Sequence, residues 1–185
     1  MDNAVLAALA KWPDVPHCYG WLSLDRRGQW RLQGEVIRHR GLADFIGRNY
    51  THDDAGNWFF QNGPQRVYVE LAYTPWVFHL DGSGRLLSHT GIAVQAVESA
   101  WIDDEGSLIL GTDLGTGIVD DRDLASFEAR LTGAIENKVD AAANRGDDKA
   151  QQLLNWNDTA IPVFQTSAEA LARTFAFRAS PIPSQ

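Results

Sequence analysis

The chain has 185 residues, of which 44% are hydrophobic and 22% are charged. This is an ordinary globular composition, which excludes intrinsic disorder, and the length allows one compact domain or two small packed halves. A formal net charge of -8 and a pI near 5.0 repel phosphate groups, so the sequence predicts no nucleic-acid partner and no membrane partner.

Cys18 is the only cysteine, so neither an intrachain disulfide nor a Cys-rich zinc site can form. The apolar run from Ala4 to Ala10 follows an acidic residue and precedes Lys11, which favours a short helix over a cleaved leader. No stretch approaches the roughly 20 apolar residues that a membrane helix needs. The sequence therefore predicts a cytoplasmic protein.

Four segments share a turn of the form Asp-x-x-Gly with alternating apolar and polar residues on both sides. This pattern is typical of a β-hairpin whose glycine adopts a positive φ. The four hairpins are expected at residues 21–32, 50–60, 76–86 and 101–110. Residues 66–73 alternate in the same way and predict a further strand that ends before Pro75.

Helical periodicity is confined to a few segments. Residues 41–50 and 123–131 each place apolar side chains on one face and predict short amphipathic helices. Residues 136–144 and 149–156 have a weaker helical pattern, residues 161–164 and 174–178 favour closing strands, and residues 180–185 indicate a loose tail.

The hairpin and helix of the first part of the chain recur later. The helix starts share an arginine followed by Leu-Ala-x-Phe, and the hairpins before them align when the second copy has a longer loop. The sequence thus predicts an α+β fold of antiparallel β-hairpins packed with short helices, in two halves, 1–95 and 96–185, with a repeated hairpin-helix motif. Chance resemblance between short segments is the alternative. Duplication predicts equivalent positions for Arg40 and Arg122, and burial of Leu42, Phe45, Leu124 and Phe127.

No catalytic signature is present. His52, Asp53 and Asp54, like His79 and Asp81, could offer metal ligands, but Asp at a hairpin turn more commonly bonds backbone N–H groups. His17 and Cys18 are neighbours whose side chains point to opposite faces of a strand, which argues against an activated pair. A Gly-x-Ser-x-Gly turn, a phosphate loop and a zinc-binding helix are absent, so we predict no cofactor and no metal, and no catalytic residue can be named.

The aromatic residues around the second and third hairpins are the best candidates for binding. Consecutive large rings followed by a polar turn could line an apolar pocket, although packing of the core is the alternative. The predicted ligand-binding residues are Trp58, Phe60, Gln61, Asn62, Arg66, Tyr68, Tyr73 and Trp76.

Residues 11–90 resemble a bacterial family of uncharacterised proteins, domain of unknown function 1285. The likeness is carried by Lys11-Trp12-Pro13, by Pro16-His17-Cys18-Tyr19-Gly20 with the hairpin after it, and by Val67-Tyr-Val-Glu-Leu-Ala-Tyr-Thr-Pro75-Trp76. The resemblance implies a two-part α+β fold with repeated motifs, no established enzyme activity and a role in signal transduction, and it supplies no catalytic residues.

Three functions follow as hypotheses. The first is a non-enzymatic module that binds a small molecule or a protein partner in regulation or signal transduction. The alternative is a metal-dependent hydrolase, which requires His52, Asp54, His79 and Asp81 to converge on one metal ion. The third is a structural subunit of a larger assembly. The oligomeric state cannot be read from the sequence.

Overall fold

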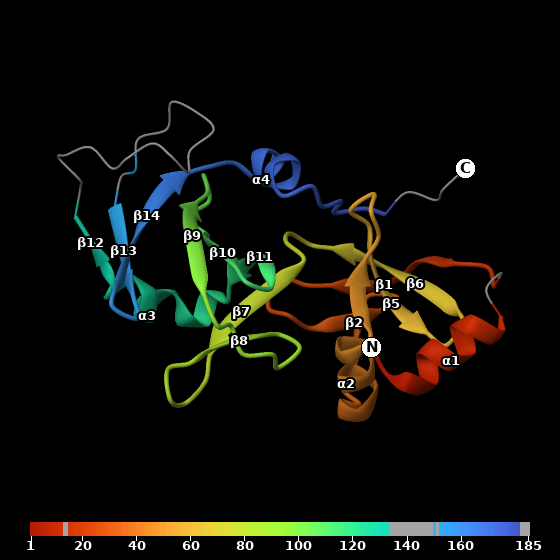
Figure 1. Ribbon diagram of the computed structural model, residues 1–185. Coiled ribbons are helices and arrows are strands. Elements are labelled where there is room, and N and C mark those ends of the chain that lie inside the picture. The colour runs from red at the N-terminus through yellow and green to blue at the C-terminus, as the bar shows by residue number, and fades with distance from the viewer. Residues whose placement is uncertain (13–14, 134–149, 151, 182–185) are drawn as a thin grey trace.

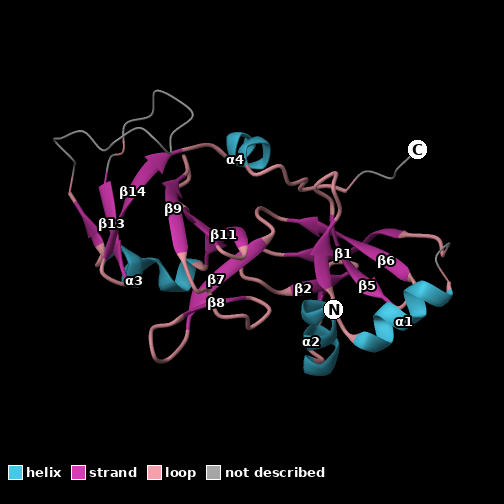
Figure 2. Ribbon diagram, in the orientation of Figure 1, coloured by secondary structure: helices cyan, strands magenta, loops and turns pink. Residues whose placement is uncertain are grey.

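The computed structural model describes residues 1–12, 15–133, 150 and 152–181. These residues form two mixed β-sheets that lie side by side, with four α-helices around them (Figures 1 and 2). The α+β fold predicted from the sequence is confirmed. Both sheets contribute to one continuous cluster of buried apolar side chains.

The first sheet has six strands in the order β3-β2-β1-β6-β5-β4. Helix α1 (Asn3–Lys11) precedes the sheet, and α2 (Arg40–Arg48) connects β3 to β4. Neighbouring strands are antiparallel except for β1 and β6, which pair in parallel at the centre. The strands are β1 (Cys18–Leu24), β2 (Trp30–Leu32), β3 (Glu35–Val36), β4 (Tyr50–His52), β5 (Trp58–Asn62) and β6 (Gln65–Leu71).

The second sheet has eight strands in the order β12-β13-β14-β9-β10-β11-β7-β8. Two pairs are parallel, β14 with β9 and β11 with β7. The strands are β7 (Trp76–Leu80), β8 (Leu86–Ser88), β9 (Val97–Ile102), β10 (Leu108–Thr112), β11 (Gly115–Val119), β12 (Leu131–Thr132), β13 (Gln152–Trp156) and β14 (Thr159–Gln165). The helical elements are η1 (Asp121–Asp123), α3 (Leu124–Glu128) and α4 (Ala168–Thr174).

The two sheets contain the same unit twice. The strands from β9 to β14 occupy the order β11-β10-β9-β14-β13-β12, which matches β3-β2-β1-β6-β5-β4 strand for strand. In both units a helix connects the third strand to the fourth, and the first strand pairs in parallel with the sixth. The predicted repeat is therefore confirmed, and it covers the whole six-stranded unit rather than the hairpin and helix alone.

The four Asp-x-x-Gly turns share one geometry. In each turn an Asp carboxylate oxygen accepts the backbone N–H groups two and four residues later, at 2.7–3.0 Å. The glycine has a φ of +76° to +81°, a conformation that other residues rarely adopt. The four turns begin at Asp25, Asp53, Asp81 and Asp103.

Several local predictions differ from the structure. Residues 152–156 form strand β13 rather than a helix, because they pair with β12 on one side and β14 on the other. Residues 174–178 do not form a strand; α4 ends at Thr174, and only Arg178 makes an isolated bridge, to Asn57. The helix predicted at 136–144 lies outside the described residues.

The helix starts of the two units are less alike than predicted. Phe127 is buried as expected, but Phe45 and Leu124 are half-buried. Leu42 is exposed because it lies at the edge of a groove described below. Arg122 bonds the Asp120 carboxylate, whereas the Arg40 side chain has no such partner among the described residues. The arginine is thus not a shared structural device.

The two sheets meet along a mixed polar and aromatic contact. Arg26 pairs with Glu105 at 3.0 Å and lies 4.5 Å over the ring of Tyr73, whose hydroxyl donates to Asp103 at 2.5 Å. After α4 the chain returns to the first sheet, where the N–H of Leu71 donates to the carbonyl of Ala179 (Figure 1). The β7–β8 hairpin, which the predicted first half 1–95 includes, belongs to the second sheet. The division of the chain at residue 95 stays a prediction.

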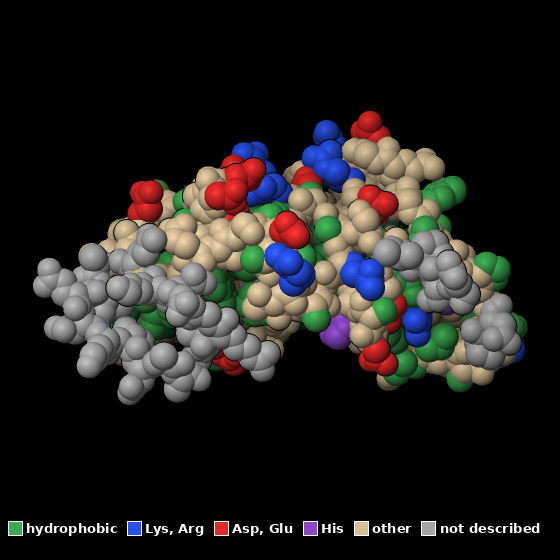
Figure 3. Space-filling model, turned by 90° about the horizontal axis from the view of Figure 1, so that it is seen from above, with side chains coloured by type: hydrophobic (Ala, Val, Ile, Leu, Met, Phe, Trp, Pro, Cys, Tyr) green, Lys and Arg blue, Asp and Glu red, His purple; other side chains and the backbone are tan. Residues whose placement is uncertain are grey.

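The surface carries charges of both signs. On the face seen in Figure 3, Lys and Arg side chains are interspersed with Asp and Glu side chains. None of the helices in the described part of the chain is both long enough and apolar enough to cross a bilayer.

Candidate functional site

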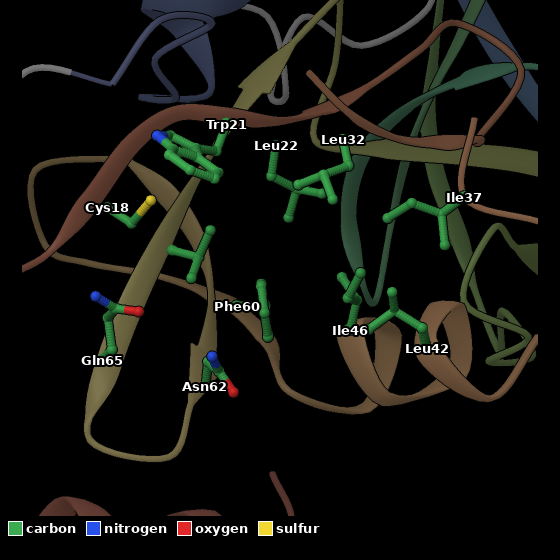
Figure 4. A pocket seen from close by; sticks show the side chains of 11 residues that line it. Cys18, Trp21, Leu22, Leu32, Ile37, Leu42, Ile46, Phe60, Asn62 and Gln65 are labelled. Atoms are coloured by element: carbon green, nitrogen blue, oxygen red, sulfur yellow. The ribbon is translucent and has the colours of Figure 1, made fainter. Parts of the chain in front are cut away.

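An apolar groove of about 420 Å³ lies between the first sheet and α2 (Figure 4). Two polar side chains, Asn62 and Gln65, lie at the end away from Ile37 and Leu42. The remaining lining is apolar and consists of Cys18, Trp21, Leu22, Leu32, Ile37, Leu42, Ile46, Phe60 and Val67.

Strand register explains why these side chains share a face. Residues directly opposite each other on neighbouring strands point to the same side of a sheet. Phe60 is opposite Val67, Asn62 is opposite Gln65, and Leu22 is opposite Leu32. The second wall comes from α2, where Leu42 and Ile46, four residues apart, lie on one helical face.

The rim of the groove exposes large apolar side chains. Trp21 is 53% exposed, Leu32 is 45% exposed and Leu42 is 39% exposed. Trp21 and Leu22 both line the groove, although neighbours in a regular strand face opposite sides. The pairing of β1 with β6 shifts register between Cys18 and Leu22, and Gly20 there has a φ of +73°. This irregularity accounts for the presence of Trp21 at the groove.

In the described part of the second unit, large side chains pack together at the equivalent face. Strand pairing makes Leu154 the equivalent of Phe60, and Trp156 the equivalent of Asn62. Trp156 stacks on Phe127, with ring centroids 5.5 Å apart and planes 7° apart, and both side chains are buried. The first unit has an amide in place of the indole, and its face remains open.

The structure does not bring the eight predicted binding residues together. Phe60 and Asn62 line the groove, while Gln61, Arg66 and Tyr68 belong to the opposite face of the sheet, as alternation along β5 and β6 requires. Trp58 and Trp76 are buried in an aromatic cluster, and Tyr73 lies at the contact between the sheets. The cluster comprises Trp30, Tyr50, Trp58, Trp76 and His89. Ligand binding by the eight residues stays a prediction.

Sequence reasoning missed most of the groove. Its walls come from β1, β2, β5, β6 and α2, and their meeting depends on the parallel pairing of β1 with β6. The one signal in the sequence was the glycine before a tryptophan, Gly20-Trp21, which precedes the alternating residues of this strand.

The acidic and histidine residues at the turns do not form a metal site. Among the described residues, no three His, Cys, Asp or Glu side chains are placed to hold a metal ion. The hydroxyl of Ser83, then the backbone and side chain of Arg85, donate to Asp81 and hold its pKa well below the usual range. Burial opposes ionisation of Asp53, but hydrogen bonds from Asn57, Tyr68 and Ala55 lower its pKa. The convergence that the hydrolase alternative requires is not found in the described residues.

The sequence matches, over residues 1–182, the family described as Protein of unknown function (DUF2946). The chain belongs to this family. No curated protein matches the sequence.

Two solved structures are similar in fold. A DUF1285 family protein from Silicibacter pomeroyi matches with a TM-score of 0.57 and 13% identity, over 89% of this chain and 96% of that one. A DUF1285 family protein from Shewanella baltica matches with a TM-score of 0.45 and 14% identity, over 59% of this chain and 91% of that one. The first of these supports the resemblance to DUF1285 and extends it, as a likeness of fold, through both units.

Proposed function

We propose that this protein is a non-enzymatic binding module whose groove takes up an apolar small molecule. The observation that carries the proposal is the difference between the two units. Among the described residues of the second unit, Phe127 and Trp156 pack together at the equivalent face, so the fold itself does not require an exposed apolar lining there. A cavity of about 420 Å³ is also within the range of roughly 300 to 1,000 Å³ that small-molecule sites occupy.

A regulatory role would follow from the position of α2. This helix supplies Leu42 and Ile46 to the groove. On its other side, a Cβ added to Gly47 would lie 3.1 Å from the Cβ of Thr90, so the helix backbone packs closely against the loop after β8. A ligand that displaces α2 would therefore change a contact with the second sheet, which is a physical basis for the signalling role that the DUF1285 resemblance implies.

A neutral dye tests the proposal. N-phenyl-1-naphthylamine, which fluoresces in apolar surroundings, should bind the protein saturably with one site per chain. Asn62→Trp, which places an indole where the second unit has Trp156, should weaken dye binding at least about tenfold. Glu98→Trp adds an indole at an exposed position of β9 and should leave dye binding unchanged.

The reactivity of the Cys18 thiol tests whether the dye binds in the groove. Cys18 is the only cysteine and lines the groove, so bound dye should slow its reaction with N-ethylmaleimide. Absence of saturable dye binding, or equal affinity in the wild type and Asn62→Trp, would contradict the proposal.

A further inference from the structure

The groove restricts what can be bound inside it. None of its lining residues carries a charge, and its two polar side chains, Asn62 and Gln65, are at one end. A buried charge or an unpaired polar group in such a lining costs several kcal/mol. The part of a ligand that lies along the groove must therefore be apolar.

A polypeptide is a poor occupant for the same reason. A peptide backbone has an N–H and a C=O in every residue, and these require partners when buried. Strands β1 and β6, which form the floor, already pair with neighbours on both sides, so neither offers a free edge. An acyl or alkyl chain has no such requirement.

Two arginines are close in sequence to the lining residues at the other end of the groove. Arg38 and Arg40 are exposed and lie in the chain between Ile37 and Leu42, which both line the groove. Between them, His39 is occupied, because its Nδ1 accepts the N–H of Leu42 at the start of α2. Neither arginine pairs with Glu35 or Asp44, the acidic residues nearest in the sequence.

The absence of partners at Arg38 and Arg40 distinguishes them from the other described arginines. Each of the other described arginines has a carboxylate, a backbone carbonyl or an aromatic ring as partner. These are Arg26, Arg27, Arg31, Arg48, Arg66, Arg85, Arg122, Arg130, Arg173 and Arg178. Because no protein partner among the described residues neutralises them, the guanidinium groups of Arg38 and Arg40 are available to an anion in a chain whose net charge is -8.

We propose that the groove binds an amphiphile with a single apolar chain, and that Arg38 and Arg40 bind its anionic headgroup. This inference rests on the proposed apolar-ligand function and names the class of ligand. The planar guanidinium fits a carboxylate and a phosphate equally well, so both headgroups belong to the class. The chain extends from the arginines over Ile37 and Leu42 towards Phe60.

Four ligands with the same chain test the proposal: dodecanoate, dodecyl phosphate, dodecanol and dodecyltrimethylammonium. Each is titrated against bound N-phenyl-1-naphthylamine below its micelle concentration at pH 7.5, and the protection of Cys18 is measured in parallel. At least one anion should displace the dye about tenfold more tightly than dodecanol, and the cation should be the weakest. Of the ligands that bind, only the two anions should bind more weakly at higher salt, because salt screens their attraction to the arginines.

Substitution of each arginine tests whether it contacts the headgroup. Arg38→Gln and Arg40→Gln should each weaken anion binding several-fold and leave dodecanol binding unchanged. Arg173→Gln removes one exposed charge on α4 and should change neither. Dodecanol binding as tightly as both anions, or anion binding that is unaffected in both arginine variants, would overturn this inference while leaving the proposed function standing. Failure of every ligand, and of the dye, would overturn both.

Discussion

Acid should destabilise the protein through one buried side chain, His89. Its ring packs against those of Trp30, Tyr50 and Trp76, with centroids 5.1–5.7 Å away. Its Nδ1 accepts the N–H of Val77 at 3.3 Å, which requires an unprotonated Nδ1. Burial, and secondarily the charge of His79, lower the pKa of His89 from 6.5 to about 3.

Protonation of His89 favours the unfolded chain, so the free energy of unfolding falls in acid. The unfolded chain binds a proton at His89 below pH 6.5 and the folded protein does not, so the stabilising effect of a neutral His89 is complete above pH 6.5. It is lost progressively as the pH falls from 6.5 towards 3. At about 1.36 kcal/mol per pKa unit, the free energy of unfolding should fall by about 2 kcal/mol between pH 7 and pH 5, and by about 5 kcal/mol in the limit.

Urea unfolding followed by tryptophan fluorescence at pH 7 and pH 5 measures this effect. His89→Asn keeps an acceptor for the N–H of Val77 but does not titrate, so its stability should change much less over this interval. His79→Gln should retain most of the wild-type loss, since burial is the larger cause. Equal losses in the wild type and His89→Asn would refute the reasoning, because carboxylates or other histidines would then carry the pH dependence.

Two further pairs of variants test the packing. Phe127→Ala should lower the free energy of unfolding by about 3 to 5 kcal/mol, and Phe45→Ala, at the equivalent but half-buried position, by about 1 to 2 kcal/mol, measured by urea unfolding. Similar losses would contradict the different filling of the two units. In Gly56→Ala and Gly84→Ala the new alanine is strained by a φ near +80°, at a cost of about 1 to 2 kcal/mol. In Gly56→Ala the new Cβ would also lie against the carbonyl of Ala176, whereas the space at Gly84 is open. Gly56→Ala should therefore lose more stability and speed tryptic cleavage at Arg173 and Arg178, whereas equal behaviour would exclude a tight contact with the C-terminal segment.

Much of the fold could be predicted because its signals are local. Each Asp-x-x-Gly turn contains the residues that stabilise it, because the Asp carboxylate accepts two backbone N–H groups and the glycine adopts the positive φ. The four hairpins were therefore predicted correctly. The repeat was visible where hairpin and helix start recur. Strand β13 was predicted as a helix because its pairing with β12 and β14 depends on contacts that a local pattern does not contain.

The groove could not be predicted for a related reason. Whether Phe60 faces the groove together with Leu22 depends on the parallel register of β1 and β6, which are separated by five elements in the sequence. The eight predicted binding residues included neighbours in sequence, such as Phe60 and Gln61, that a strand places on opposite faces. Burial of Trp58 and Trp76 likewise depends on the contact between the two sheets.

The open groove lowers the stability of the first unit relative to one whose apolar side chains are all buried. Fully burying a leucine or a comparable side chain stabilises a protein by about 1.5 to 3 kcal/mol, and the second unit has this stabilisation at its equivalent face. Trp21, Leu32 and Leu42 remain substantially exposed, so the first unit forgoes part of it. An apolar ligand that covers these three side chains would recover that free energy, and because it binds only the folded state, it would raise the stability of the whole chain.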